Sequence, residues 1–305
     1  MPRRISAIDV GSNAIRMMVA ELNPTAPYVH IVKKFRAPVR LGHDTFTTGT
    51  ISPHSLEIAL DTFTQFAKTN KKFGVESCRA VATSACREAS NRKEFQDLIY
   101  KKSGIKVDII DGVEEGRLIH LAVQKELDLD AKKTMLIDIG GGSVEVTFSQ
   151  GPKMEATKSF PMGTVRVLEN LAKRKMNESQ LNVIMGEFLP AISKHICENT
   201  DHDPVDFAIG TGGNLECLGQ LKGSLLQKAP TTYLTLTELG QIIDRLRSLS
   251  MKDRVEKLKL RPDRADVILP ASVLVQTILR QAEVEKIMIP NVGLRDGLIW
   301  SMIKL

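Results

Sequence analysis

Two short turns rich in glycine carry the residues best suited to phosphate chemistry. The segment IDVGS at residues 8–12 recurs as IDIGG at residues 137–141. Glycines let the backbone approach a ligand closely, and successive backbone N–H groups form a nest that binds anions. Asp9 and Asp138 would repel a phosphate unless a hard cation such as Mg²⁺, or its water shell, lay between. The pattern indicates a phosphoanhydride ligand with a metal. The alternative is that both aspartates only cap their turns through Asx-type hydrogen bonds.

Further hydrogen-bond donors lie in these turns and in a third one. Ser12, Asn13 and Ser143 add hydroxyl and amide groups, and IGTGGN forms another glycine-rich turn at residues 209–214. If two related lobes faced each other, a cleft between them would be lined with backbone N–H groups and carboxylates. The alternative is a chance recurrence of a short motif. The phosphate-binding residues expected in the three turns are Asp9, Gly11, Ser12, Asn13, Gly140, Gly141, Gly142, Ser143, Gly212 and Gly213.

Two charged segments offer catalytic groups. Arg87, in TSACRE at residues 83–88, follows an expected buried strand and is suited to bidentate contact with phosphate oxygens. The alternative is a surface ion pair with Glu88 or another neighbour. Glu114 and Glu115 begin an expected helix, where a carboxylate can activate water as a general base or simply favour the helix dipole. Adjacent residues on a helix point in different directions, so at most one of the two should face a ligand.

Other catalytic motifs are absent from the sequence. It contains no GxxxxGK[ST] loop, no GxGxxG fingerprint, no HExxH and no GxSxG, and its six histidines show no ligand spacing. The cysteines at positions 78, 86, 197 and 217 form no CxxC pair, which argues against a zinc ribbon or a thioredoxin-like site. We expect Cys78 and Cys86 to be reduced packing residues.

Strands and helices alternate along the chain and must position these turns. Apolar runs bounded by turn residues predict strands at residues 5–8, 15–19, 29–40, 78–83, 106–110 and 285–289. A helical apolar period predicts helices at residues 52–73, 91–103, 114–126, 177–198, 236–249, 265–282 and 293–303. The mixture predicts an α/β protein, and the repeated turn predicts two related lobes with a boundary near residues 124–132.

Composition and charge narrow the class of protein. The 305 residues are 42% hydrophobic and 26% charged, which predicts about two globular domains and excludes disorder, collagen and a disulfide scaffold. Lys and Arg outnumber Asp and Glu by 19 to 14 in residues 1–126 and by 23 to 22 in the remainder. A basic first part suits an anionic partner, such as a phosphate ligand, a nucleic acid or an acidic surface. The alternative is a solvated face that aids solubility.

The expected localisation is cytoplasmic. Arg3 and Arg4 precede an apolar stretch, but Asp9 and Arg16 interrupt it, so it is not a signal peptide. The longest nearly apolar segment, residues 267–279, contains several polar residues and is too short to cross a bilayer.

The sequence as a whole resembles the exopolyphosphatase/guanosine pentaphosphate phosphatase (Ppx/GppA) family. The resemblance lies in segments that occur in the family's order over residues 5–300: IDVGSNAIRMMVAE, VRLG, ATSACREA, DGVEEGRLIHLAV, LIDIGGGSVEV, FPMGTVRV, IGTGGN and RADVILPA…GLRDG. LIDIGGGSVE together with EEGR is the most specific part, whereas IDVGSN alone would be weak.

The resemblance implies a fold of the actin and sugar-kinase superfamily, with two ribonuclease-H-like lobes and a cleft between them. The lobes would be residues 1–126 and 127–292, with a closing helix at about residues 293–305 packing back onto the first. The resemblance implies a short two-domain form, and the extra C-terminal domains of longer members are not expected.

The resemblance also implies roles for particular residues. Glu115 matches the catalytic base, and Asp138 and Glu145 match the metal site, for which Mg²⁺ or another divalent cation is expected. Arg40 and Arg87 match basic residues near the phosphate path. Gly116 and Asn214 depart from the family pattern, and Asn214 leaves the contribution of the third turn open.

The activity that the resemblance implies is metal-dependent hydrolysis of the terminal phosphoanhydride of inorganic polyphosphate, which releases orthophosphate. The first alternative is removal of the 5′ phosphate from guanosine pentaphosphate. An actin-like ATPase or kinase and a non-catalytic polyphosphate sensor are further alternatives. The segment GVEEGR argues against a kinase, and the set Glu115, Asp138 and Glu145 argues against a sensor. Neither a nucleic acid nor a membrane is an expected partner, and a homodimer is suggested only by analogy.

Overall fold

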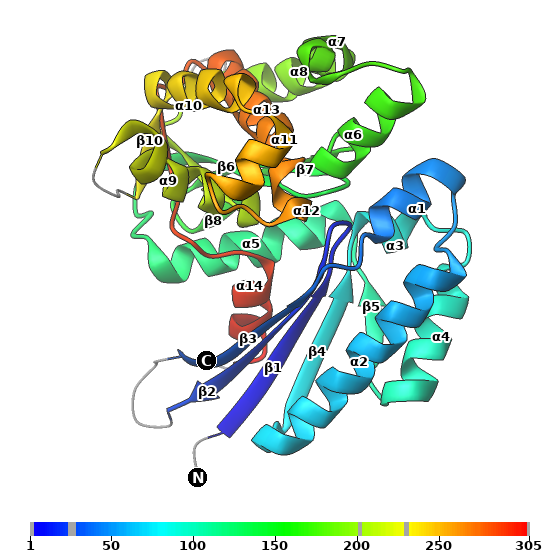
Figure 1. Cartoon of the computed structure of the whole chain (residues 1–305). Helices are drawn as coiled ribbons and strands as arrows, with labels where there is room; N and C mark the ends of the chain where they lie inside the picture. Colours follow the sequence, from blue (N-terminus) through cyan, green and yellow to red (C-terminus); the bar gives the residue numbers. More distant parts are fainter. Residues whose placement is uncertain (1–2, 24–28, 201–202, 229–231, 304–305) are drawn as a thin grey trace. The chain divides into compact units, whose positions relative to one another are not determined.

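Two compact units make up the chain (Figure 1). The computed structural model describes residues 3–23, 29–200, 203–228 and 232–303. The first unit comprises Met1–Ala122 and Leu294–Leu305, and the second unit comprises Val123–Gly293. Each unit has its own cluster of buried apolar side chains, so each is held together by a core of its own.

The first unit is built on a five-stranded sheet. Its strand order is β3-β2-β1-β4-β5, where β1 to β3 are antiparallel and β4 and β5 are parallel to β1. The strands are β1 (Arg3–Val10), β2 (Ile15–Leu22), β3 (Val29–Ala37), β4 (Ser77–Ala82) and β5 (Val107–Ile109). The helices are α1 (Leu41–Thr48), α2 (Pro53–Phe73), α3 (Ser84–Glu88), α4 (Arg92–Ser103), α14 (Leu294–Ser301) and α5 (Gly112–Glu126), which ends in the second unit.

Local sequence signals account for α2, whose prediction at residues 52–73 is confirmed. Ser52 caps the helix by accepting a hydrogen bond from the N–H of Ser55 at 3.2 Å, and Pro53 lies in the first turn. Phe63 and Phe66 are buried on its apolar face. In Figure 1, α2 lies beside α4, and α14 lies against β1.

The second unit is built on a six-stranded sheet with the order β10-β11-β9-β6-β7-β8. The strands are β6 (Lys133–Ile139), β7 (Val144–Gln150), β8 (Lys153–Phe160), β9 (Phe207–Thr211), β10 (Tyr233–Thr235) and β11 (Lys286–Met288). The helical segments are α6 (Thr164–Lys173), η1 (Glu178–Gln180), α7 (Leu181–Gly186), α8 (Leu189–Thr200), α9 (Gly213–Leu226), α10 (Leu236–Ser248), α11 (Met251–Glu256), α12 (Pro262–Ala265) and α13 (Ile268–Gln281).

The two sheets repeat one topology. Strands β6, β7 and β8 are antiparallel, and β9 and β11 follow in parallel, as in the first unit. The Gly11 N–H donates to the Ala14 carbonyl at 3.2 Å, and the Gly140 N–H donates to the Ser143 carbonyl at 3.0 Å. A bulge follows Val19 in β2 and Phe148 in β7, which are equally far beyond Asp9 and Asp138. The predicted α/β fold of two related lobes is therefore confirmed.

Two details differ from the expectations, and the end of the closing helix is not described. The single helix predicted at residues 177–198 is wrong, because η1, α7 and α8 replace it. Pro190 is the second residue of α8, and a proline is tolerated in a first turn but not in a continuous helix. The strand predicted at residues 29–40 ends at Ala37, and α1 starts soon after. Residues 304 and 305 of the expected closing helix lie outside the described residues.

None of the helices in the described part of the chain combines the length and the hydrophobicity that a transmembrane span requires.

Candidate active site

The first glycine turn of the first unit is surrounded by the polar residues expected near it. The Ser12 hydroxyl lies 2.9 Å from the Ser84 hydroxyl at the start of α3. The Arg40 Nε donates to the Asn13 Oδ1 at 3.1 Å, and the Gly42 N–H donates to the Ser12 carbonyl at 2.8 Å. Strand β1, α1 and α3 therefore bring Ser12, Asn13 and Arg40 together, as a phosphate-binding role requires.

Asp9, at the end of β1, lies directly opposite Arg16 on β2. Their charged groups are 3.9 Å apart, between Asp9 Oδ2 and an Arg16 guanidinium nitrogen. Burial raises the pKa of Asp9 above its ordinary value, and the positive charges of Arg16 and Arg295 offset only part of that effect. Burial therefore disfavours the ionised carboxylate, and the positive charges that offset this effect, Arg16 and Arg295, both belong to the first unit.

Arg87 and Glu115 are neighbours in the first unit. The Arg87 side chain donates to the Ile110 carbonyl at 2.8 Å, and the same nitrogen lies 3.8 Å from Glu115 Oε2. Glu115 lies in the first turn of α5, and its side chain is 8% exposed. Its backbone N–H donates to the Asp111 carbonyl at 3.0 Å, which anchors that turn. The structure therefore places a carboxylate beside a guanidinium on two short, well-anchored segments.

Glu114 has different surroundings from Glu115. It accepts hydrogen bonds from Arg117 at 2.6 and 2.9 Å and from Arg79 at 3.3 Å. The hydrogen bond from Arg117 is the main cause of the lowered pKa of Glu114. Ion pairs therefore engage Glu114, and the helix turns Glu115 toward Arg87.

Cys86, in the same short helix as Arg87, is not a nucleophile. It is fully buried, and burial raises its pKa to about 12. A thiol with that pKa carries almost no thiolate at neutral pH. The surrounding polar residues fit a reaction in which water attacks.

The second unit carries a pair of carboxylates in the position of the Asp9–Arg16 pair. Asp138 on β6 lies directly opposite Glu145 on β7. The Thr211 hydroxyl donates to Asp138 Oδ1 at 2.6 Å, and the Ser159 hydroxyl donates to Glu145 Oε1 at 2.7 Å. Two carboxylates opposite each other repel, and their oxygens are the ligands that hard divalent cations prefer. This pair of side chains fits a metal-binding role.

The start of α6 holds the second glycine turn. An added Cβ at Gly163 would lie 2.3 Å from the Gly142 nitrogen, so only glycine allows this approach. Donors on α6 bind the carbonyl oxygens of the turn, which fixes the orientation of its peptide groups. Among these pairs are Thr164 N with Gly140 O at 3.0 Å, Val165 N with Gly141 O at 2.8 Å, and Arg166 Nε with Gly142 O at 2.9 Å.

The third glycine turn packs against the second. Gly212 has a φ of 86°, and an added Cβ there would lie 3.0 Å from Asp138 Oδ1. The Asn214 amide donates to the Ile139 carbonyl at 3.3 Å, and the Arg264 guanidinium donates to Asn214 Oδ1. The contribution of Asn214 that the sequence left open is thus a bridge between β6 and Arg264.

Several partners of the expected residues were not predicted from the sequence. They are Arg16, Ser84, Ser159, Thr211 and Arg264, each in contact with an expected residue. Arg16, Ser84 and Arg264 lie inside the family-like segments IDVGSNAIRMMVAE, ATSACREA and RADVILPA, which was the available signal. Thr211 likewise lies inside the family-like segment IGTGGN, whereas Ser159 carried no comparable signal, because hydroxyl residues are common in strands.

Two repeated α/β units, each with an aspartate beside a glycine turn, define the two-lobed actin-like class of proteins. Comparisons with solved structures agree. A Ppx/GppA family member from Aquifex aeolicus is 26% identical and has a TM-score of 0.80, with 99% of this chain and 98% of that chain covered. An exopolyphosphatase from Cytophaga hutchinsonii, at 24% identity, shares the fold with a TM-score of 0.88 over 98% of this chain and 97% of its own.

The Ppx/GppA phosphatase family matches residues 18–305. "Exopolyphosphatase 1" of Mycobacterium tuberculosis is 27% identical over 304 residues, which cover 97% of this chain and 87% of that protein. The chain belongs to the Ppx/GppA phosphatase family.

Proposed function

We propose that this protein is an exopolyphosphatase, which hydrolyses the terminal phosphoanhydride of inorganic polyphosphate and releases orthophosphate. The observation that carries the proposal is the placement of Glu115 beside Arg87 at 3.8 Å, in a chain of the phosphatase family. The likeness to "Exopolyphosphatase 1" over 97% of the chain supports polyphosphate as the substrate.

In this proposal Glu115 acts as the general base. It accepts a proton from the attacking water as the new bond to the terminal phosphorus forms and the bridging P–O bond breaks. The leaving chain keeps the electron pair of the broken bond. Arg87 donates N–H groups to phosphate oxygens, since a guanidinium matches their geometry, and Arg40 adds a second positive charge beside Asn13.

The second unit carries carboxylates and backbone donors of the kinds that this reaction uses. Asp138 and Glu145 are the residues that would hold a divalent cation, for which Mg²⁺ is the expected ion. Such a cation would neutralise negative charge on the phosphate oxygens. The Gly140 N–H closes the turn on the Ser143 carbonyl, so the N–H groups of residues 141–143 and of Gly212 and Gly213 are the proposed donors to developing charge, and α6 orients the first set.

Phosphate release from three substrates tests the proposal. The purified protein with Mg²⁺ is incubated separately with long-chain polyphosphate, guanosine pentaphosphate and ATP, and orthophosphate is measured over time. We expect the highest kcat/KM with polyphosphate. The Glu115→Gln variant, purified in parallel, reports any contaminating phosphatase. A preference for guanosine pentaphosphate would show that polyphosphate is not the main substrate, whereas the proposed hydrolysis of a phosphoanhydride would stand. No release from any substrate would reject the proposal.

A further inference from the structure

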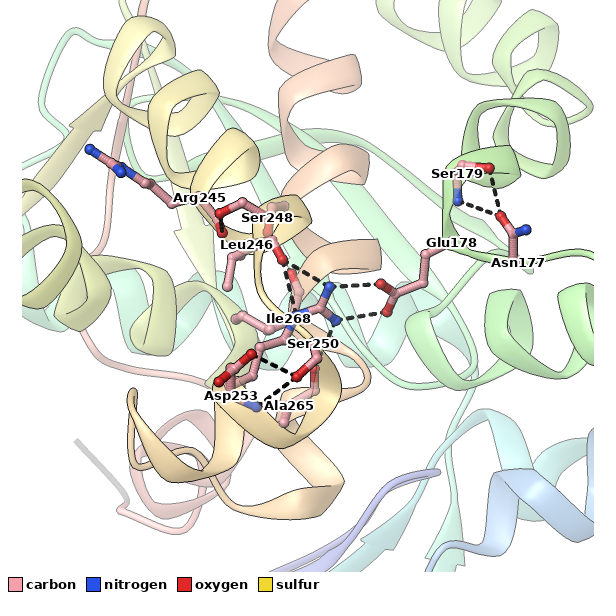
Figure 2. A network of polar contacts seen from close by, with 12 residues as sticks. Asn177, Glu178, Ser179, Arg245, Leu246, Ser248, Ser250, Asp253, Ala265 and Ile268 are labelled. Carbon is pink, nitrogen blue, oxygen red and sulfur yellow. Dashed lines mark hydrogen bonds and ion pairs between the residues drawn. The ribbon is translucent and has the colours of Figure 1, made fainter.

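The guanidinium of Arg254 is a buried charge with an unusually complete set of partners. Arg254 lies on α11, and its side chain is 2% exposed. It donates to both oxygens of the Glu178 carboxylate, at 2.7 Å each. It also donates to the Leu246 carbonyl at 3.2 and 2.9 Å and to the Ala265 carbonyl at 3.3 Å. Figure 2 labels the partners Glu178, Leu246 and Ala265, which come from separate segments of the second unit.

The partners of Arg254 come from elements that are distant in the sequence. Leu246 is in the last turn of α10, Ala265 is the last residue of α12, and Glu178 begins η1. Glu178 is itself held in place, because η1 starts with a capping box between Asn177 and Gln180. A two-pronged contact between a guanidinium and a carboxylate fixes orientation as well as distance. Arg254 therefore determines where α12 lies relative to α10 and η1.

Helix α12 connects the contacts of Arg254 to the glycine turns. Arg264 precedes Ala265, is 6% exposed, and donates to the Asn214 side chain. Asn214 donates in turn to the Ile139 carbonyl at 3.3 Å, at the end of the strand that carries Asp138. The neighbouring Thr211 donates to the Asp138 carboxylate at 2.6 Å. A displacement of α12 would withdraw Arg264 from the third turn.

We propose that Arg254 and Glu178 are positioning residues for the phosphatase reaction. They hold α12 so that Arg264 fixes Asn214 and the third glycine turn beside Asp138. The role in catalysis rests on the proposed function, whereas the effect on the turn does not. Only Arg254 is buried in this ion pair, since the Glu178 side chain is 40% exposed, and such a pair by itself is weak support for stability. The directed contacts to two carbonyl groups and one carboxylate are what an orienting role requires.

Two conservative variants and a matched control test this role. Arg254→Lys keeps the charge but loses the fork, and Glu178→Gln keeps the shape but loses the charge. The control is the exposed ion pair of Arg174 and Glu187, also in the second unit, with the variants Arg174→Lys and Glu187→Gln. The control pair joins residues of the same two types through two guanidinium–carboxylate contacts.

Hydrogen–deuterium exchange of the full-length protein provides a readout that does not depend on activity. We expect Arg254→Lys and Glu178→Gln to speed amide exchange at residues 211–216 by roughly tenfold or more, because the turn opens more readily once α12 is released. The control variants should leave exchange there unchanged. Unchanged exchange in both test variants would overturn the proposal, even if their melting temperatures fell.

Kinetics supply the second readout. In Arg254→Lys, phosphate release should fall on the order of ten- to a hundredfold, as expected when a group near the reaction is misplaced. Combining it with Arg264→Lys should cause little further loss, because both changes break one chain of contacts. Fully additive losses would show that Arg254 does not act through Arg264. If the wild-type protein releases no phosphate, the proposed function fails, and the exchange experiment still decides the positioning role.

Discussion

The hairpin β1–β2 of the first unit and the hairpin β6–β7 of the second unit share a backbone but differ in charge. Both place an aspartate before a glycine turn, and both close the turn with the same N–H to carbonyl hydrogen bond. The residue opposite the aspartate is Arg16 in the first hairpin and Glu145 in the second. A single cross-strand position therefore converts a self-neutralised pair into a doubly negative one.

This difference in charge means that the two units of the duplicated fold suit different ligands. In the first hairpin, Arg16 lies 3.9 Å from Asp9 and offsets part of the effect of its burial, and Arg40 and Arg87 add positive charge to this unit. The second hairpin concentrates carboxylate oxygens and gains from a cation. The first unit is thus suited to bind phosphate and supply a base, and the second is suited to hold a metal.

The largest effect is expected from the base of the first unit. Glu115→Gln should lower kcat by about 10²-fold or more, because a positioned base contributes roughly 10²–10⁴-fold to a rate. Substrate binding should be largely retained, which a titration of the variant with polyphosphate measures. Glu114→Gln is the matched control and should cost much less, because Glu114 is engaged by Arg117 and Arg79. Near-normal turnover in both variants would show that neither Glu115 nor Glu114 is the general base.

The next largest effect distinguishes the two aspartates. Asp138→Asn should raise the Mg²⁺ concentration for half-maximal phosphate release by roughly 10- to 100-fold. The variant removes either an anionic oxygen ligand of the metal or the acceptor for a water bound to the metal. Asp9→Asn should not shift that concentration, since Arg16 already faces Asp9. Equal shifts in both variants would show that the two hairpins do not differ in metal binding. Full activity of the wild type in excess chelator would reject a metal altogether.

A moderate effect is expected from the cations of the first unit. Arg87→Ala and Arg40→Ala should each weaken polyphosphate binding about tenfold, because each removes a charge-assisted hydrogen bond. The salt dependence of the Kd should also become flatter, since fewer counterions are released on binding. Arg87→Lys should restore only part of the affinity.

Lys173 and Arg174, on the second unit, serve as the control pair for the binding experiment. Their replacement by alanine should change the Kd little. A loss equal to that of Arg87→Ala would mean that diffuse charge on either unit, rather than the cations of the first one, holds the substrate.

The smallest effect concerns the stability cost of Asp9. Its pKa is higher in the folded protein than the ordinary value of 3.8, so ionisation of Asp9 is less favourable in the folded state than in the unfolded state. The free energy of unfolding therefore decreases as the pH rises above 3.8. Asp9→Asn should therefore raise the Tm near pH 7, by about 2–4 °C for each kcal/mol relieved. The gain over the wild type should shrink toward zero as the pH falls through 3.8, where both side chains are neutral. A lower Tm for the variant at pH 7 would show that the pair with Arg16 outweighs the cost of burial.

Elements with strong local signals were predictable from the sequence. Helix α2 is an example, because its cap at Ser52 and its apolar period lie within the segment itself. The glycine turns and their aspartates were predictable for the same reason. The broken segment from residue 177 to 200 was not, because its apolar period continues across Pro190 and conceals the break.

The sequence by itself determined the repeated turns, the α/β class and the residue types available for phosphate chemistry, because each depends on neighbours along the chain. Only the tertiary structure decided which partner each of these residues has. Ser12 pairs with Ser84, Asp138 with Thr211, and Asn214 with Arg264, across separations of 72, 73 and 50 residues. Contacts at such separations depend on how helices and strands pack, and no local period or turn signal encodes that.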